Sequence, residues 1–146
     1  MDLKRPESVL VVIYSLQGRV LMLQRQDDPE FWQSVTGTLE PGELPIQTAY
    51  REVAEETGIA LSMESGLIQD CDQVNRYAIR ELWLNRYPKG TKFNTEHVFC
   101  LCIDQTNQLR LTEHLSFQWL AKAEAIALAW SKTNADAIAQ FVPEVL

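Results

Sequence analysis

The sequence predicts a domain of the α/β (α+β) class, in which a β-sheet lies between layers of helices. Strand-like runs occupy both halves of the chain, one helix-like segment lies between them at 45–57, and Ala-rich helical segments follow near the end. Strands that flank a middle helix, with further helices at the end, are typical of such a sandwich. The 146 residues suffice for one core and are too few for two, so we expect a single domain over 1–146.

The first part of the chain predicts an antiparallel hairpin and a third strand. The runs SVLVVIY and RVLMLQR are rich in apolar and β-branched residues, and the SLQG between them ends in Gly18, which suits a hairpin turn. The run FWQSVTG, residues 31–37, is expected to be one strand that ends at Gly37, where a tight turn or a close backbone approach is expected.

The remainder predicts three more strands and two helices. One strand is expected within 67–79, and the apolar runs 95–103 and 115–120 are expected to be central strands. The segments KAEAIALAWS and NADAIAQFV have the apolar spacing of helices, and Asn134 is the expected N-cap of the last one.

Composition and charge narrow the class of protein. Apolar residues make up 46% and charged residues 23% of the chain, as in an ordinary soluble globular protein. The apolar run at 9–14 is too short to span a bilayer and lacks the cleavage site of a signal peptide. A formal net charge of −7 disfavours binding to nucleic acid or anionic membranes, and it would repel a polyphosphate unless cations intervene. Cys71, Cys100 and Cys102 lack a disulfide or zinc spacing, so we expect buried free thiols in a reducing cytoplasm.

The helix expected at 45–57 gathers acidic residues on one side. It has a proline at its first position and Gly58 just after its end, where glycine is favoured. At about 100° per residue, Glu52, Glu55 and Glu56 fall within an arc of about 100°, beside the apolar face of the helix. Like charges at these spacings cost about 0.2–0.5 kcal/mol per pair. A hard divalent cation such as Mg²⁺ or Mn²⁺ would offset that repulsion, and the alternative is a solvated acidic surface.

Residues 37–59 fit one longer pattern that favours the metal. They read G-x5-E-x7-R-E-U-x-E-E-x-G-U, where U is aliphatic, and average residue frequencies give a chance match of about 10⁻⁹ per starting position. This pattern is the Nudix box, so the chain resembles the Nudix hydrolases, which bind divalent metal and cleave pyrophosphates such as X-linked nucleoside diphosphates. The resemblance implies a Nudix α/β/α sandwich with a mixed sheet and a catalytic loop-helix-loop.

The resemblance also implies roles for particular residues. Glu43 and Arg51 would form a supporting pair that holds the loop against the helix. In a more distant loop, Glu113 of TEH would be a further metal-binding or catalytic carboxylate, and either Glu56 or Glu113 would accept a proton from the attacking water. The implied metal ligands are Glu52, Glu55, Glu56, Glu113 and the Gly37 carbonyl, and the catalytic candidates are Glu52, Glu56 and Glu113.

The segments outside the box are similar to bacterial Nudix enzymes that act on dihydroneopterin triphosphate, early in folate biosynthesis. The similar segments are LVVIY, RVLMLQR, FWQSVTG and TEH. The implied reaction is Mg²⁺-dependent hydrolysis of that pterin triphosphate to the monophosphate and pyrophosphate, with Mn²⁺ as a second possible metal. The first alternative is a pyrophosphatase of nucleoside triphosphates, including oxidised ones. The second is a non-catalytic Nudix module that binds a nucleotide, although no carboxylate of the box is lost.

A triphosphate and its ring need further partners in an acidic chain. Cations near strand ends could hold the phosphates, and the strand edge at 77–80 could line a ring pocket. Phe31, Trp32 or Tyr77 could stack on the ring or pack in the core instead. The substrate-binding candidates are Lys4, Arg25, Thr36, Tyr77, Ala78, Ile79, Arg80 and Ser131.

Overall fold

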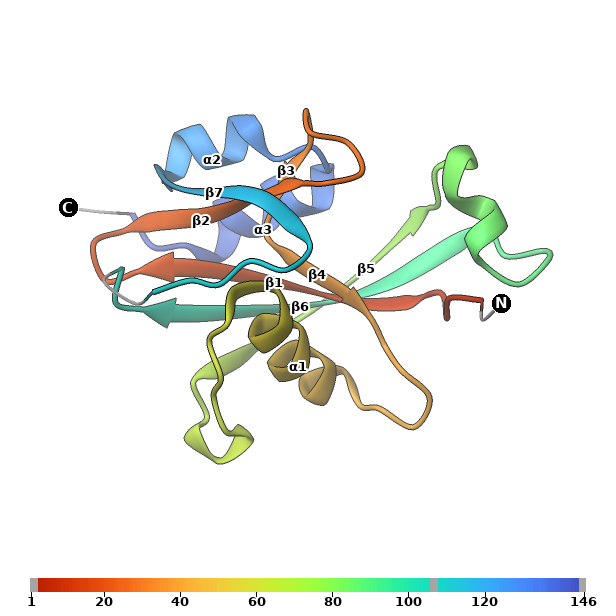
Figure 1. The fold of residues 1–146 in the computed structure, drawn as a ribbon, viewed down its shortest axis with the longest axis horizontal. Coiled ribbons are helices and arrows are strands. Elements are labelled where there is room, and N and C mark those ends of the chain that lie inside the picture. Colours follow the sequence, from red (N-terminus) through yellow and green to blue (C-terminus); the bar gives the residue numbers. More distant parts are fainter. Residues whose placement is uncertain (1–2, 106–107, 145–146) are drawn as a thin grey trace.

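A computed structural model describes residues 3–105 and 108–144 (Figure 1). Short 3-10 helices, η1 (Met63–Ser65) and η2 (Glu81–Arg86), precede and follow the fifth strand. The strands are β1 (Glu7–Ser15), β2 (Arg19–Arg25), β3 (Trp32–Gln33), β4 (Val35–Thr38), β5 (Ile68–Ala78), β6 (Phe93–Ile103) and β7 (His114–Ala121). The α-helices are α1 (Pro45–Thr57), α2 (Lys122–Leu128) and α3 (Lys132–Phe141).

The strands form one mixed sheet, as the sequence predicted. Strand β1 lies at its centre, parallel to β6 and antiparallel to β4 and β2. The order along the sheet is β3-β2-β1-β6-β5, and β7 pairs with β2. The predicted hairpin between β1 and β2 turns at Gly18, whose φ of 79° is a conformation that glycine adopts readily.

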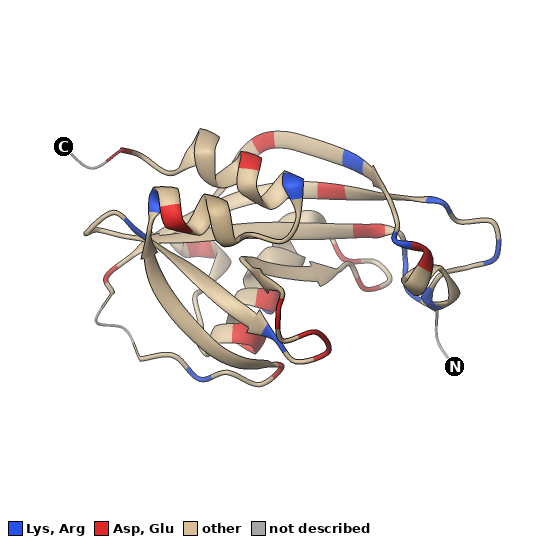
Figure 2. Ribbon diagram, turned by 90° about the horizontal axis from the view of Figure 1, so that it is seen from above, with Lys and Arg blue, Asp and Glu red and all other residues tan. Residues whose placement is uncertain are grey.

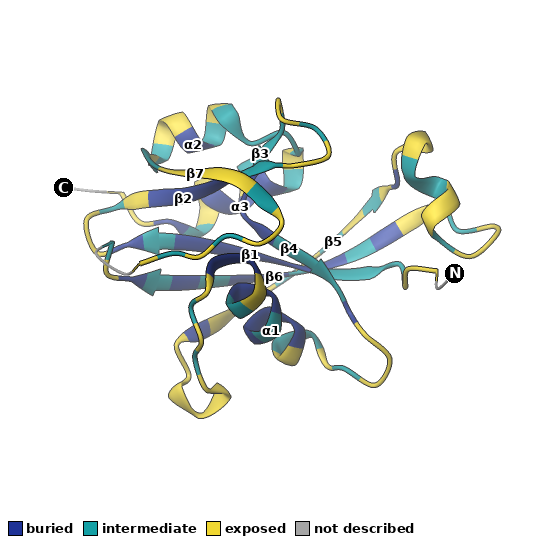
Figure 3. Ribbon diagram, in the orientation of Figure 1, coloured by how far each residue is buried: buried dark blue, intermediate teal, exposed yellow. Residues whose placement is uncertain are grey.

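Helices cover the two faces of this sheet and give the expected α/β/α sandwich (Figure 1). Side chains alternate along a strand, so β1 contributes to two cores. Val9 and Val11 pack in the core that contains α1, whereas Leu10 and Val12 pack in the core that contains α2 and α3. The central strands are accordingly buried (dark blue in Figure 3).

The segment 31–37 is two strands, although the sequence predicted one. The strand is interrupted at the buried Ser34. Before it, β3 pairs with β2, and after it, β4 pairs with β1. The amide oxygen of Asn134 accepts a hydrogen bond from the Ser34 backbone N–H at 2.8 Å, and the Asn134 amide nitrogen donates to the Ser34 hydroxyl at 2.9 Å. A partner one hundred residues away therefore fixes this break.

The expected N-cap of the last helix was wrong. Helix α3 begins at Lys132, and Ser131 is its cap, because the Ser131 hydroxyl accepts from the backbone N–H of Asn134 at 3.2 Å. Ser131 and Asn134 both have side chains that can cap a helix, so local preference does not separate them. A tertiary contact decides which residue is the cap, since the Asn134 side chain is 1% exposed and hydrogen-bonded to Ser34.

Only one of the two runs predicted to be central is central. Strand β6 lies between β1 and β5, as expected. The run 115–120 lies in β7, whose one recorded partner among the described residues is β2, so it forms an edge. Leu115 and Phe117 on β7 are 52% and 39% exposed (Figure 3). Apolar alternation indicates a strand but not its place in the sheet.

Acidic residues lie on helices, strands and loops alike (Figure 2). None of the helices in the described ranges is long and apolar enough to cross a membrane. Cys71, Cys100 and Cys102 are free thiols, as predicted, but each is partly rather than fully buried. Burial raises the pKa of Cys71 to about 12, so this thiol stays protonated near neutral pH.

Candidate active site

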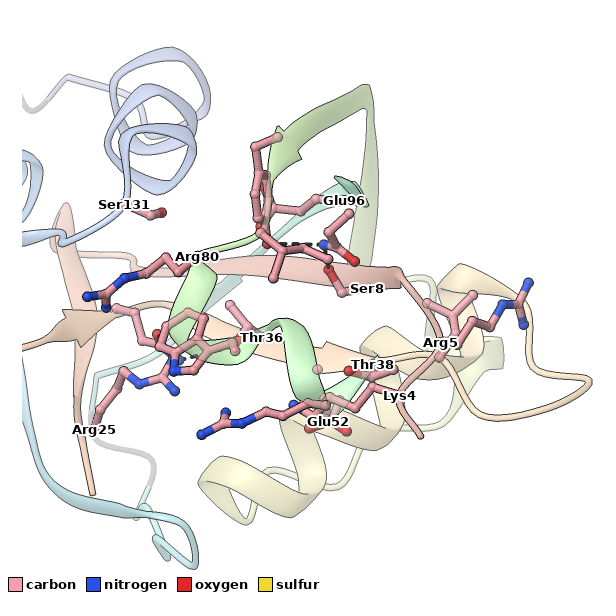
Figure 4. A pocket seen from close by; sticks show the side chains of 18 of the residues that line it. Lys4, Arg5, Ser8, Arg25, Thr36, Thr38, Glu52, Arg80, Glu96 and Ser131 are labelled. Atoms are coloured by element: carbon pink, nitrogen blue, oxygen red, sulfur yellow. Dashed lines mark hydrogen bonds between the residues drawn. The ribbon is translucent and has the colours of Figure 1, made fainter. Parts of the chain in front are cut away.

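A pocket of about 990 Å³ lies where the N-terminal segment, the sheet, η2, α1 and the start of α3 meet (Figure 4). All eight substrate-binding candidates line it, although they come from the N-terminal segment, β2, β4, β5, the residues just after β5 and the cap of α3. The pocket is also lined by four of the five candidate metal ligands: Gly37, Glu52, Glu56 and Glu113. The structure therefore brings these residues together, and their individual roles stay predictions.

Helix α1 carries the acidic residues and ends where the sequence predicted. Gly58 caps it in the left-handed conformation, with φ of 80°, and its N–H bonds the Ala54 carbonyl. Glu52 and Glu56 are 7% and 1% exposed. The Glu55 side chain is 49% exposed and lies outside the pocket lining. The helix thus directs two of its three carboxylates inward.

Glu52 and Glu56 form a buried pair of carboxyl groups whose charged forms repel each other. Burial raises the pKa of Glu52, and it raises the pKa of Glu56 well above its usual value, with repulsion from Glu52 as the next cause. A hydrogen bond joins the two carboxyl groups, so one of them carries a proton. The Oε2 atom of Glu56 is buried without a hydrogen-bond partner among the described residues. This is an unfavourable arrangement unless a ligand completes it.

Gly37 on β4 allows this pair to approach the sheet. A Cβ at this position would lie 2.1 Å from Cδ of Glu52, which is far below van der Waals contact. The close backbone approach expected at Gly37 is therefore present, and the group that approaches is a candidate metal ligand.

Arg51 fastens the preceding loop to α1. Its Nε donates to Glu43 Oε2 at 2.8 Å and its Nη2 donates to Glu43 Oε1 at 2.9 Å, in a bidentate pair. The same guanidinium bonds the Thr38 carbonyl at 3.0 Å, Glu52 at 2.5 Å and Glu55 at 3.2 Å. The Arg51 hydrogen bonds lower the pKa of Glu43 to about 2. Arg51 therefore links the loop, β4 and two box carboxylates.

We expect Arg51→Met to lower the free energy of unfolding at pH 7 by about 1–3 kcal/mol, because several charge-assisted hydrogen bonds are lost. The folded-state pKa of Glu43 is depressed, so its contribution is present above its ordinary value of 4.5 and is lost as pH falls towards 2. The difference between wild type and variant should shrink over that window in urea unfolding curves. Lys132→Met, which breaks an exposed pair with Asp136, is the control and should change stability little. A difference between wild type and Arg51→Met that is constant from pH 7 to pH 3 would contradict this account.

Two residues of the TEH segment reach the same carboxylates. Glu113 is close enough that its charge raises the pKa of Glu56. His114 Nε2 lies 3.5 Å from Glu56 Oε1, and burial lowers the pKa of His114 to about 4. His114 is therefore a neutral group near pH 7. The sequence singled out Glu113 and gave no signal for His114.

Several cations line the same pocket as the acidic residues. Lys4, Arg25 and Arg80 were predicted from the sequence, and Arg86 on η2 was not. Burial lowers the pKa of Lys4, and the charges of Arg86 and Arg25 lower it further. In Figure 4 the side chains of Lys4, Arg25 and Arg80 come from separate segments into one pocket. Cations this close repel one another, and an anion would relieve that repulsion.

Aromatic rings contact three of these cations, Arg25, Arg80 and Arg86. Of the rings that could stack on the substrate or pack in the core, Phe31 and Trp32 lie outside the pocket lining. Phe31 stacks on Trp130 with ring centroids 4.8 Å apart, too close to admit another ring between them. Arg25 and Arg80 each lie 4.9 Å from the centroid of Trp83. Trp32 packs against the core beside α3 instead of lining the pocket.

Gln33 joins three parts of the pocket and was not predicted. Its Oε1 accepts from Trp130 Nε1 at 2.9 Å and from Arg25 Nη1 at 3.1 Å, and its Nε2 donates to the Thr36 hydroxyl at 3.0 Å. Gln33 is 4% exposed. Its contacts span almost one hundred residues of sequence, so no local pattern could indicate them.

The carboxylates fit a hard divalent cation in chemistry, although they are not set as a preformed cage. Within the described residues, no three His, Cys, Asp or Glu side chains have the arrangement of a metal site. The ion pair with Arg51 and the proton shared with Glu56 hold Glu52 in its present position. The unpartnered Glu56 oxygen and the shared proton are features that a bound cation would resolve.

Comparison with known proteins gives a consistent result. The family model described as NUDIX domain matches residues 4–144. The dihydroneopterin triphosphate diphosphatase of Escherichia coli K12 is 48% identical over 95% of this chain and 93% of its own length, and that of Haemophilus influenzae is 41% identical over 97% and 90%. The solved structure of the E. coli dihydroneopterin triphosphate pyrophosphohydrolase superimposes with a TM-score of 0.91, at 46% identity over 97% of this chain and 98% of that one.

Proposed function

Because this chain belongs to the Nudix family, we propose that it is a Mg²⁺-dependent pyrophosphohydrolase that converts dihydroneopterin triphosphate to dihydroneopterin monophosphate and pyrophosphate. The observation that carries this proposal is the 48% identity to an enzyme named for that substrate over nearly the whole of both chains. The pocket supports it, since acidic residues and cations line one space that is large enough for a small triphosphate.

The cations would hold the phosphate chain. Lys4, Arg25, Arg80 and Arg86 all line the pocket, and a triphosphate would supply the negative charge that their mutual repulsion favours. Gln33 and Asp27 fix the position of Arg25 before any substrate binds, because they accept hydrogen bonds from its guanidinium. Because Arg25 is already held in position, less conformational entropy is lost when the phosphates bind to it.

Glu52, Glu55, Glu56 and Glu113 are the residues that would hold the metal, and Gly37, whose backbone lies close to Glu52, would add its carbonyl. Nudix hydrolases generally use a divalent metal. When bound, Mg²⁺ would neutralise the charge that develops on the phosphate oxygens and lower the pKa of water. Burial places Glu52 and Glu56 where water screens them little, so their attraction for a cation is strong, whereas Glu113 is exposed.

A carboxylate of the same group would accept the proton of the attacking water. Glu56 has a raised pKa and an unpartnered oxygen, which suit a group that gains and loses a proton. Glu113 is the alternative, since it also lines the pocket. Neutral His114 keeps the environment of Glu56 free of a competing positive charge.

Steady-state kinetics on a panel of triphosphates tests the substrate. We expect kcat/KM for dihydroneopterin triphosphate to exceed that for dATP, GTP and an oxidised dGTP, by about ten- to ten-thousand-fold. The reason is that a purine differs from a pterin in its second ring, and polar groups matched to that part of the pterin are left unpaired. A nucleotide that exceeds the pterin by tenfold would replace this proposal with the nucleotide-pool alternative. Release of pyrophosphate from none of them would favour the non-catalytic module.

A further inference from the structure

The part of the sheet that lines the pocket carries a row of polar side chains. Ser8 on β1 is in register with Glu96 on β6 and with Thr38 on β4, so their side chains share one face of the sheet. Asn94 lies two residues before Glu96 and donates to Ser8 Oγ at 2.8 Å and to Tyr77 Oη at 3.0 Å. All five residues line the pocket, and Figure 4 shows Glu96 beside Ser8.

Glu96 is the charged member of this row and is 3% exposed. Its Oε1 accepts a hydrogen bond from Asn75 Nδ2 at 3.2 Å, and the Thr133 side chain supplies a second hydrogen bond. Burial raises the pKa of Glu96. No Lys, Arg or His of the described residues forms an ion pair with it.

A buried carboxylate without a cation is costly unless its oxygens are well satisfied. A carboxylate has about four acceptor sites, so two neutral donors leave about half of that capacity unused. Glu96 lines the pocket, so a ligand that enters the pocket can use this spare acceptor capacity. Such a ligand should offer N–H or O–H groups in place of further acceptors.

The edge of a 2-amino-4-oxopyrimidine ring has this chemistry. It presents two neighbouring N–H donors, one on the ring nitrogen and one on the exocyclic amine, and a carboxylate pairs with such a fork through both oxygens. Guanine has the same edge as a pterin. Hypoxanthine lacks the amine, and adenine presents an acceptor nitrogen beside its amine.

We propose that Glu96 selects the ring of the substrate by accepting both N–H groups of a 2-amino-4-oxopyrimidine edge. Pterin and guanine triphosphates then bind in preference to hypoxanthine and adenine triphosphates. This inference rests on the proposed function, because it assigns the pocket to a triphosphate that carries a ring. Glu96 lies on β6, apart from the carboxylates of α1, so its contribution is to ring binding.

Binding of GTP, ITP and ATP to the full chain tests the inference without the pterin. These ligands share their ribose and phosphates and differ in the ring edge. Trp83 and Trp130 line the pocket, so quenching of tryptophan fluorescence reports occupancy. Dissociation constants are measured in Ca²⁺, and released pyrophosphate is monitored to establish that each triphosphate stays intact.

We expect wild type to bind GTP about 10- to 100-fold more tightly than ITP, since ITP lacks one charge-assisted hydrogen bond. In Glu96→Gln that preference should fall to about one. The amide has one acceptor and one donor group, which match the edge of adenine. The ratio of the dissociation constant of ATP to that of GTP should therefore fall in this variant. Glu124→Gln, which changes an exposed carboxylate of α2 outside the pocket lining, should keep the wild-type preference.

Equal binding of GTP and ITP by wild type would overturn the inference and needs no variant. Absence of binding by all three ligands would overturn it too. A Glu96→Gln variant that loses the same factor for all three would show a structural role instead. The proposed function can fail separately. If wild type prefers GTP but releases no pyrophosphate from any triphosphate in Mg²⁺, the Glu96 contact is supported and the proposed hydrolase activity is contradicted.

Discussion

Glu56→Gln is expected to lower kcat by at least about a hundredfold while the fold is kept. The side chain is 1% exposed, has an oxygen without a partner among the described residues, and is close enough to Glu52 and Glu113 for their charges to raise its pKa, so it is placed either to hold the metal or to take the proton of water. Losing either role costs about this much. The measurement is the rate of pyrophosphate release at saturating substrate and metal.

The same variant should unfold at the wild-type temperature or above it when no metal is present. Repulsion from Glu52 and burial both disfavour the charge on Glu56, and glutamine of almost the same shape removes that charge. Glu124→Gln, on the exposed side of α2, should retain the wild-type rate. A Glu56→Gln enzyme that turns over within threefold of wild type would remove this residue from the chemistry.

Removal of divalent metal with excess EDTA should abolish turnover, and millimolar Mg²⁺ or Mn²⁺ should restore it. The reason is that Glu52, Glu56 and Glu113 place negative charge where the phosphates must react, and the ion pair of Arg51 with Glu52 offsets only part of it. Full turnover in EDTA would mean that the acidic wall has another purpose.

Metal should also raise the thermal unfolding temperature, and more so as pH rises. The folded-state pKa of Glu56 is raised, so the metal-free protein loses stability as pH rises above 4.5 towards that pKa and the buried carboxyl ionises. A cation competes with the proton for the same oxygens. The shift in unfolding temperature caused by Mn²⁺ should therefore be larger at pH 8 than at pH 5, as measured by calorimetry.

The sequence predicted the half of the site that is local in the chain. The Nudix box lies within residues 37–59, and helical spacing alone placed Glu52 and Glu56 on one side of α1. Glycine preferences likewise predicted the end of that helix at Gly58. Glu55 has the same helical spacing but lies beside Arg51 and is partly exposed to solvent. The buried side of α1 is narrower than the arc of about 100° over which its three glutamates are spread.

The rest of the site depends on pairing between distant segments. Glu96 stands in an alternating strand where the sequence indicates a face but not what covers it, and its register with Ser8 follows from a parallel contact between β1 and β6. Gln33 meets Trp130 across almost one hundred residues. Asn134 was assigned to a cap because its contact with Ser34 is equally remote.

The central claim is that the carboxylates of α1 support metal-dependent cleavage of a pterin triphosphate to the monophosphate and pyrophosphate. Phosphorus NMR of dihydroneopterin triphosphate incubated with the protein tests it most directly, because it distinguishes pyrophosphate from orthophosphate. With Mg²⁺ we expect the triphosphate signals to be replaced by those of pyrophosphate and a monophosphate, and with EDTA we expect no change. Orthophosphate as the first product, or the same products in EDTA, would contradict the account.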